Sequence, residues 1–168
     1  MDERGKKEII EINLKSGTIC LQAFWNLNTK GHYGRAKMKI LVGYDGSNES
    51  KKALRLSQKH AKKLGAKIEV ATAINRYDPL EYHKIQESEQ ELDLDVKEIL
   101  NGNNALYETH LLVNELSPGD QLVVFAERYH VDEIIIGAPK RTRVGKLLLG
   151  STAQYIVLNA PCPVVTVN

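Results

Sequence analysis

The chain has no long hydrophobic run, only two cysteines and no large excess of charge of one sign. Its longest apolar stretches, such as QLVVFA and EIIIGA, are far shorter than the roughly 20 residues that span a bilayer. The N-terminal segment MDERGKKEIIEINLK lacks the apolar core of a signal peptide. Cys20 and Cys162 have neither zinc-site spacing nor the pattern of a disulfide framework. These absences predict a cytoplasmic protein with reduced thiols and no membrane partner.

Motifs of several enzyme classes are also missing. The five histidines, at positions 32, 60, 83, 110 and 130, show no HExxH or other metal-ligand spacing. No G-x-S-x-G elbow marks a serine hydrolase, and GAPKRTRVGK has the wrong spacing for a Walker A loop. A net charge of +2 without a long basic block argues against a nucleic-acid-binding tail. We therefore expect no catalytic residue, no metal site and no nucleic-acid partner.

From Lys39 onward, short apolar segments alternate with amphipathic ones. The segments KILVGY, KIEVATAI, LYETHLLV, DEIIIG and CPVVTV are typical of buried strands. Helices are expected between them, started or stopped by Gly65, Asp78-Pro79 and Ser117-Pro118. The last helix begins at Ser151 and is expected to turn Ile156 and Val157 inward. Strands joined through helices form right-handed crossovers, so the pattern predicts a doubly wound α/β fold with helices on both faces of a mainly parallel sheet.

Residues 1–37 do not follow this alternation. EIIEINL and TICLQAF, joined by KSG, are compatible with a β-hairpin, and NLNTKGHYGRAK is typical of a linker. A second interpretation is that translation starts at Met38, directly before the first core strand. We therefore divide the chain into an N-terminal extension, 1–37, and one domain, 38–168. The intact mass of the protein from its own cells distinguishes the two interpretations.

Two segments at the expected carboxyl ends of strands contain polar side chains. Ligands of doubly wound sheets bind at such ends. In the first, Asp45 either accepts hydrogen bonds from a ribose hydroxyl or an adenine amino group, or shapes its turn together with Ser47. Tyr44, beside it, either packs over a ligand or covers the end of the strand. The residues alone do not separate these interpretations.

The second segment, GAPKRTRVGKLLLGST, is strongly cationic and ends where a helix begins. Four cations fall within seven positions: Lys140, Arg141, Arg143 and Lys146. Gly150 allows tight curvature, and Ser151 opens a helix whose positive end favours anions. A capping box formed by Ser151 and Gln154 is an alternative that needs no ligand. Phosphate binding and a solvated basic loop therefore both remain open.

From Met38 to Asn168 the sequence resembles the universal stress protein family. KILVGYDGSNESKKAL is similar to the family's opening strand, Asp-Gly-Ser turn and first helix, and the chain from Gly137 to Val167 is similar to its closing segment. Nucleotide-binding members carry Gly, two residues, Gly, nine residues, and then Gly followed by Ser or Thr. Gly137, Gly150 and Ser151 match this spacing.

The resemblance implies a five-stranded sheet in the order 3-2-1-4-5, which makes strands one and four neighbours and opens a crevice between the two segments. It implies ATP or another adenine nucleotide as the ligand, with magnesium left open. Asp45 would hold the nucleoside end, and the backbone near Ala73 would contact the adenine. The residues implied around the ribose and phosphates are Gly137, Gly150, Ser151 and Thr152. The strand implied at a homodimer interface consists of Pro163, Val164, Val165, Thr166 and Val167.

One position departs from the family pattern, because Lys140 stands where the second glycine is expected. Its side chain either fills the space where the backbone approaches phosphate, or adds charge beside Arg141 and Arg143. One hypothesis is a homodimeric, nucleotide-binding stress or regulatory protein that is not an efficient enzyme; slow ATPase activity is a further alternative. The other is a nucleotide-independent interaction module, with the crevice blocked by Lys140 and the basic loop facing an acidic protein partner.

Overall fold

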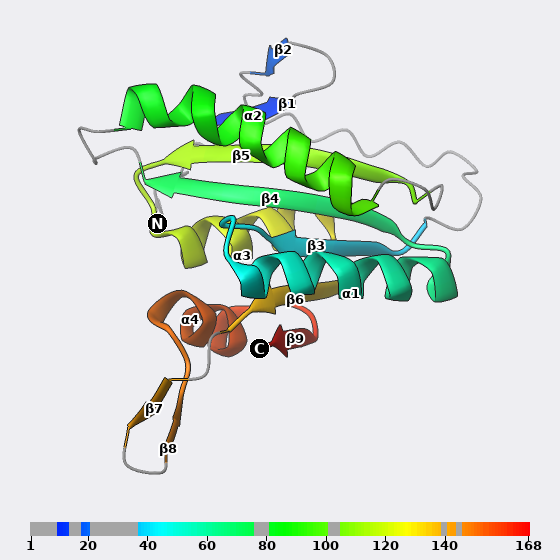
Figure 1. Ribbon diagram of the computed structural model, residues 1–168, viewed down its shortest axis with the longest axis vertical. Coiled ribbons are helices and arrows are strands. Elements are labelled where there is room, and N and C mark those ends of the chain that lie inside the picture. The colour runs from blue at the N-terminus through cyan, green and yellow to red at the C-terminus, as the bar shows by residue number, and fades with distance from the viewer. Residues whose placement is uncertain are drawn as a thin grey trace, which may run out of the picture.

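A single β-sheet forms the centre of the protein (Figure 1). The computed structural model describes the backbone of residues 10–13, 18–20, 37–75, 81–100, 105–138, 141–143 and 146–168, and the side chains of 37–75, 89–100, 105–138 and 149–168. Five strands of the domain pair in parallel, in the order β5-β4-β3-β6-β9. They are β3 (Lys39–Gly43), β4 (Lys67–Asn75), β5 (Tyr107–Asn114), β6 (Glu133–Gly137) and β9 (Val164–Val167). Counted along the domain this order is 3-2-1-4-5, so the predicted fold class and strand order are confirmed.

Helices cover both faces of the sheet. On one face α1 (Asn48–Leu64) packs over β3, β4 and β6, and α2 (Glu81–Leu100) packs over β4 and β5; both helices lie in front of the sheet in Figure 1. On the other face are α3 (Pro118–Tyr129) and α4 (Ser151–Asn159). Each face has its own apolar cluster, which agrees with strands that are apolar on both sides.

Local signals place most of the helix ends. Ser47 caps α1 by accepting a hydrogen bond from the backbone N–H of Ser50, and Ser117 caps α3 in the same way. Gly65 ends α1 in a left-handed conformation with φ of 64°. The helix start expected at Asp78 lies outside the described residues.

The expectation that Val157 faces inward is wrong. In α4, Ile156 is buried but Val157 is 44% exposed. The helix has one narrow apolar stripe, formed by Ala153 and Ile156, and the next residue is rotated by about 100° away from it. Val157 therefore faces outward.

Two further strands extend the sheet beyond β5. The backbones of β1 (Ile10–Asn13) and β2 (Thr18–Cys20) pair antiparallel, and β1 runs antiparallel along β5. The expected linker lies outside the described residues. That translation starts at Met38 stays a prediction, which the intact mass of the protein would test.

The basic segment after β6 contains secondary structure that the sequence did not predict. Strands β7 (Arg141–Arg143) and β8 (Lys146–Leu148) pair antiparallel, with Arg143 opposite Lys146. Figure 1 shows this hairpin projecting away from the central sheet, below α4. Strands of three residues are too short to produce a recognisable alternation of apolar and polar residues. None of the helices in the described parts of the chain is both long and apolar enough to cross a membrane.

Candidate functional site

A cavity of about 230 Å³ opens at the carboxyl ends of β3, β4 and β6. This is where a doubly wound sheet places its ligand, because β3 and β6 are neighbours whose helices leave in opposite directions. Residues from both segments singled out in the sequence line the cavity. Its walls are formed by Gly43, Tyr44, Asp45, Ser50, Ala71, Ala73, Pro118, Leu122, Ile136, Gly137, Thr152, Ala153 and Ile156.

Asp45 lines the cavity and also shapes the turn that leads into α1. Its Oδ1 accepts hydrogen bonds from the Ser47 hydroxyl at 2.6 Å and the Ser47 backbone N–H at 3.1 Å. Partial burial pushes the pKa of Asp45 up, but the hydrogen bonds from Ser47 and Ser50 outweigh this effect and hold the pKa below its usual value. Asp45 is therefore a carboxylate at neutral pH. The two interpretations of this residue, turn former and ligand contact, are compatible.

Tyr44 connects the cavity wall to α2. Its side chain is buried, and its hydroxyl donates a short hydrogen bond to Asp95, which also forms an ion pair with Lys51 at 3.0 Å. Burial and the bond to Asp95 raise the pKa of Tyr44 far above its usual value, so the phenol stays protonated. The sequence did not indicate this contact, because Tyr44 and Asp95 are 51 positions apart.

Beside the cavity, one backbone edge of β4 has no strand neighbour among the described residues. Pairing with β3 ends at Gly43 and Ala71, whereas β4 continues to Asn75 with only β5 at its side. The Ala71 carbonyl faces β3 and accepts from the Tyr44 N–H at 2.9 Å. Because backbone groups alternate along a strand, the N–H and C=O of Ala73 point to the same side. One donor and one acceptor therefore lie at the cavity wall where β3 has turned away.

The start of α4 forms another part of the cavity, through Thr152 and Ala153. Gly150 occupies the N-cap position, Ser151 is the first helical residue, and no side chain caps the helix. The capping box expected as an alternative for Ser151 and Gln154 is therefore wrong. Ser151 is exposed near the cavity but does not line it. Within the described part of the chain, no side-chain oxygen compensates the positive end of this helix.

The basic residues of the predicted site are described only in part. Arg141 and Arg143 belong to β7, for which the backbone alone is described, and Lys140 lies outside the described residues. In the sequence all three lie between Gly137, which lines the cavity, and Gly150, which precedes α4.

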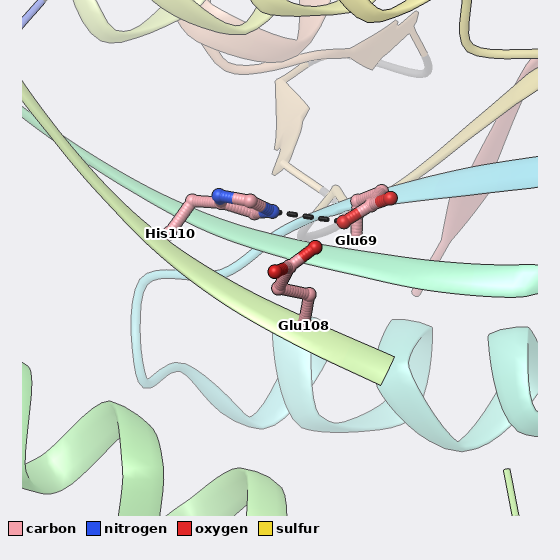
Figure 2. Close-up of side chains that lie close together, drawn as sticks. All are labelled: Glu69, Glu108 and His110. Atoms are coloured by element: carbon pink, nitrogen blue, oxygen red, sulfur yellow. Dashed lines mark hydrogen bonds and ion pairs between the residues drawn. The ribbon is translucent and has the colours of Figure 1, made fainter. Parts of the chain in front are cut away.

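A second polar cluster, which the sequence did not suggest, lies near the other end of β4. Figure 2 shows Glu69, Glu108 and His110 pointing toward one another from two adjacent strands. Among the residues that the structure describes, this is the group of His, Cys, Asp and Glu side chains able to hold a metal ion. The cluster joins residues 41 positions apart, so no motif within a short stretch of sequence could reveal it.

Comparison with known proteins agrees with this geometry. The family model described as "Universal stress protein family" matches residues 38–168. A universal stress protein of Methanocaldococcus jannaschii is 29% identical over 140 residues, which cover 77% of this chain and 81% of the relative. The solved structure of a universal stress protein from Archaeoglobus fulgidus is similar with a TM-score of 0.68 and 29% identity, over 78% of this chain and 93% of that one.

A further Archaeoglobus fulgidus structure was solved in complex with dAMP. It is 27% identical, with a TM-score of 0.65, over 78% of this chain and 98% of that one. The matched residues comprise all five parallel strands and the cavity at their carboxyl ends. The chain therefore belongs to the universal stress protein family.

Proposed function

We propose that this protein is a homodimeric stress or regulatory protein that binds an adenine nucleotide in the cavity at the carboxyl ends of β3, β4 and β6. The observation that carries the proposal is the convergence of Asp45 and Thr152 on one cavity, although they are more than 100 positions apart in the sequence. A volume of about 230 Å³ lies below the range of about 300–1,000 Å³ that is usual for ligand pockets. It suits the nucleoside part of a nucleotide, with the phosphates lying outside.

The nucleoside would be recognised from two sides. The Ala73 N–H and C=O offer the donor and acceptor that complement the acceptor and donor on the edge of adenine. The small side chains of Ala71 and Ala73 leave room for a flat ring beside the strand. The Asp45 carboxylate, whose Oδ1 is held by Ser47, would accept a hydrogen bond from a ribose hydroxyl.

The phosphates would lie at the start of α4. No side chain of the described residues caps this helix end, so its backbone N–H groups and its dipole are available to an anion. Gly150 leaves open space, since no atom of the described residues lies within 4 Å of the position of a Cβ there. Arg141 and Arg143, in the adjoining β7, would supply positive charge.

The Archaeoglobus fulgidus relative in complex with dAMP supports this choice of ligand class. In the present protein we propose that the nucleotide is a regulatory ligand, which shifts the population toward the conformation that binds it more tightly. We do not propose efficient hydrolysis, because the sequence indicates no general base that would activate water.

Calorimetric titration of the full chain with ATP, AMP and cyclic AMP, with and without magnesium, tests the proposal. We expect at least one nucleotide to bind with a dissociation constant below the millimolar range, and Asp45→Ala to weaken it. The matched control is Asp93→Ala, which removes a carboxylate of α2 that does not line the cavity. If no nucleotide binds, or if both variants bind equally well, the cavity is not a nucleotide site.

We also propose that two copies pair through β9. Among the strands that the structure describes, β9 has one neighbour, β6, and its other side lies at the end of the sheet. Monomeric proteins tend to protect such an edge, because its backbone groups invite pairing with another chain. A second copy would satisfy these groups by continuing the sheet.

A further inference from the structure

We propose that Glu69, Glu108 and His110 form a binding site for a divalent transition metal ion of the Zn²⁺ class, separate from the nucleotide cavity. The three residues lie on paired strands, with Glu69 directly opposite Glu108 in the register of β4 and β5. One potential ligand atom from each residue lies within 4.8 Å of the other two. An imidazole nitrogen with two carboxylate oxygens is a donor set that such ions accept.

The central pair of this cluster is buried. Glu69 and His110 are each 3% exposed, and His110 Nε2 lies 2.8 Å from Glu69 Oε2. The His110 ring also packs against Phe125 of α3, with ring centroids 4.8 Å apart. Two ligands of a tetrahedral ion with bonds of about 2.1 Å lie about 3.4 Å apart. An ion could therefore replace the hydrogen between these two atoms after they separate by about 0.6 Å.

Lys67 is the positive charge that already contacts the cluster. Its ammonium forms an ion pair with Glu69 Oε1 at 2.8 Å and a shorter one with Glu108. The two carboxylates therefore carry one negative charge more than Lys67 compensates, and Glu69 is buried. Burial of such a charge is costly, and a further cation relieves it.

The two oxygens of Glu69 allow an ion and Lys67 to be present together. Lys67 contacts Oε1, whereas His110 contacts Oε2, so the ion would bind on the His110 side and leave the Lys67 contact in place. Lys67 would then remain near the ion as a like charge that lowers the affinity of the site. Glu108 is partly exposed, at 29% of its side chain, and would leave the ammonium to complete the site from the solvent side.

This site is independent of the proposed nucleotide cavity. Glu69 lies in the first half of β4, whereas Ala73 lies four residues later at the carboxyl end. None of the three ligands lines the cavity. A metal ion bound here would therefore link β4 and β5 under α3 without contacting a nucleotide.

Titration of the untagged full chain with CoCl₂ tests the site, because tetrahedral Co²⁺ absorbs visible light more strongly than the octahedral aqueous ion. We expect a new absorption band that ZnCl₂ abolishes, and its loss in Glu69→Gln and His110→Gln. The matched control is His60→Gln, since His60 forms a similar pair with Glu133, at 2.9 Å, outside the cluster. This control should keep the band.

Two further measurements do not depend on the folding of the ligand variants. In the unmodified protein, Co²⁺ should broaden the NMR signals of the His110 ring and spare those of His60. In Lys67→Met, removal of the competing charge should increase the Co²⁺ affinity by about tenfold or more. The proposal is overturned if the unmodified protein gives no band at millimolar Co²⁺, if His60 broadens as strongly as His110, or if Lys67→Met binds Co²⁺ no better.

Discussion

Gly137 lies so close to Ser50 that a Cβ added at residue 137 would stand 2.6 Å from the Ser50 backbone nitrogen. The same added atom would lie 2.6 Å from the Glu49 carbonyl carbon. Both contacts are with backbone, which cannot rotate away. The first glycine of the family motif therefore lets α1 pack against the end of β6, in addition to lining the cavity. This packing brings the Asp45 turn and the end of β6 together.

We predict that Gly137→Ala destabilises the fold. The methyl group would force β6 and α1 apart, and overpacking of this kind lowers the free energy of unfolding by about 1–3 kcal/mol. Urea denaturation followed by circular dichroism measures the change. An unfolding midpoint equal to that of the unmodified protein would show that the two elements separate at no cost.

Gly150→Ala is the matched variant, and we predict the opposite pattern. Gly150 has φ of −62°, which any residue adopts, and no described atom lies within 4 Å of the added methyl position. The stability should fall by less than about 1 kcal/mol, because alanine is a poorer N-cap residue than glycine but meets no clash here. Nucleotide affinity, measured by calorimetry, should nevertheless fall, because the methyl group would occupy the proposed phosphate position. Unchanged affinity would show that the phosphates do not bind at this helix end.

Replacing Lys140 by glycine separates the two functional hypotheses. If the lysine side chain blocks the crevice, Lys140→Gly should create or strengthen ATP binding, because the backbone can then approach the phosphates. If the lysine contributes charge to a working site, the same change should weaken binding and reduce its dependence on salt. Calorimetric titration of ATP at two salt concentrations, with Lys59→Gly as a control on the exposed side of α1, distinguishes the outcomes.

The buried carboxylate of Glu69 should make the free energy of unfolding depend on pH in the acidic range. Burial raises its pKa, but the hydrogen bonds from His110 and Lys67 outweigh burial and leave the pKa below its usual value. The folded state therefore binds a proton at lower pH than the unfolded state. The resulting stabilisation is present above the pKa of an unfolded glutamate and disappears as the pH falls through the lower folded value.

We predict that Glu69→Gln flattens this acid dependence and lowers stability at neutral pH. Urea unfolding of the metal-free protein between pH 3 and pH 7 measures both effects, with the range set around the usual pKa of about 4.3. Glu98→Gln, on the exposed side of α2, is the control and should retain the slope. Parallel curves for Glu69→Gln and the unmodified protein would show that this pair does not govern acid stability.

One substitution tests the proposed dimer without disturbing the fold of each subunit. The backbone carbonyl of Val167 points toward β6, because it accepts a hydrogen bond from the Ala138 N–H at 2.7 Å. Thr166 therefore directs its N–H to the open edge of β9. Thr166→Pro removes this donor without removing a bond to β6, so it should lower the mass found by light scattering from dimer to monomer. Thr166→Val should remain a dimer, and a monomeric unmodified protein at micromolar concentration would contradict the proposal.

Much of the domain was predictable because its signals are local. Alternating apolar segments, the caps Ser47 and Ser117 and the left-handed Gly65 depend on residues within a few positions of one another. The strand order came from the family resemblance, because no residue pattern within a strand states which strand will lie beside it. The short β7–β8 hairpin and the exposed Val157 escaped prediction, since each depends on packing that a short stretch does not determine.

The amino-acid sequence by itself determined the alternation of strands and helices, the helix ends and the glycine spacing from Gly137 to Gly150. The tertiary structure decided which distant residues meet. It brought Asp45 and Thr152 to one cavity and Glu69 and His110 to within 2.8 Å of each other. The physical reason is that hydrogen bonding between parallel strands aligns residues by register, and register joins positions whose separation along the chain carries no local signal.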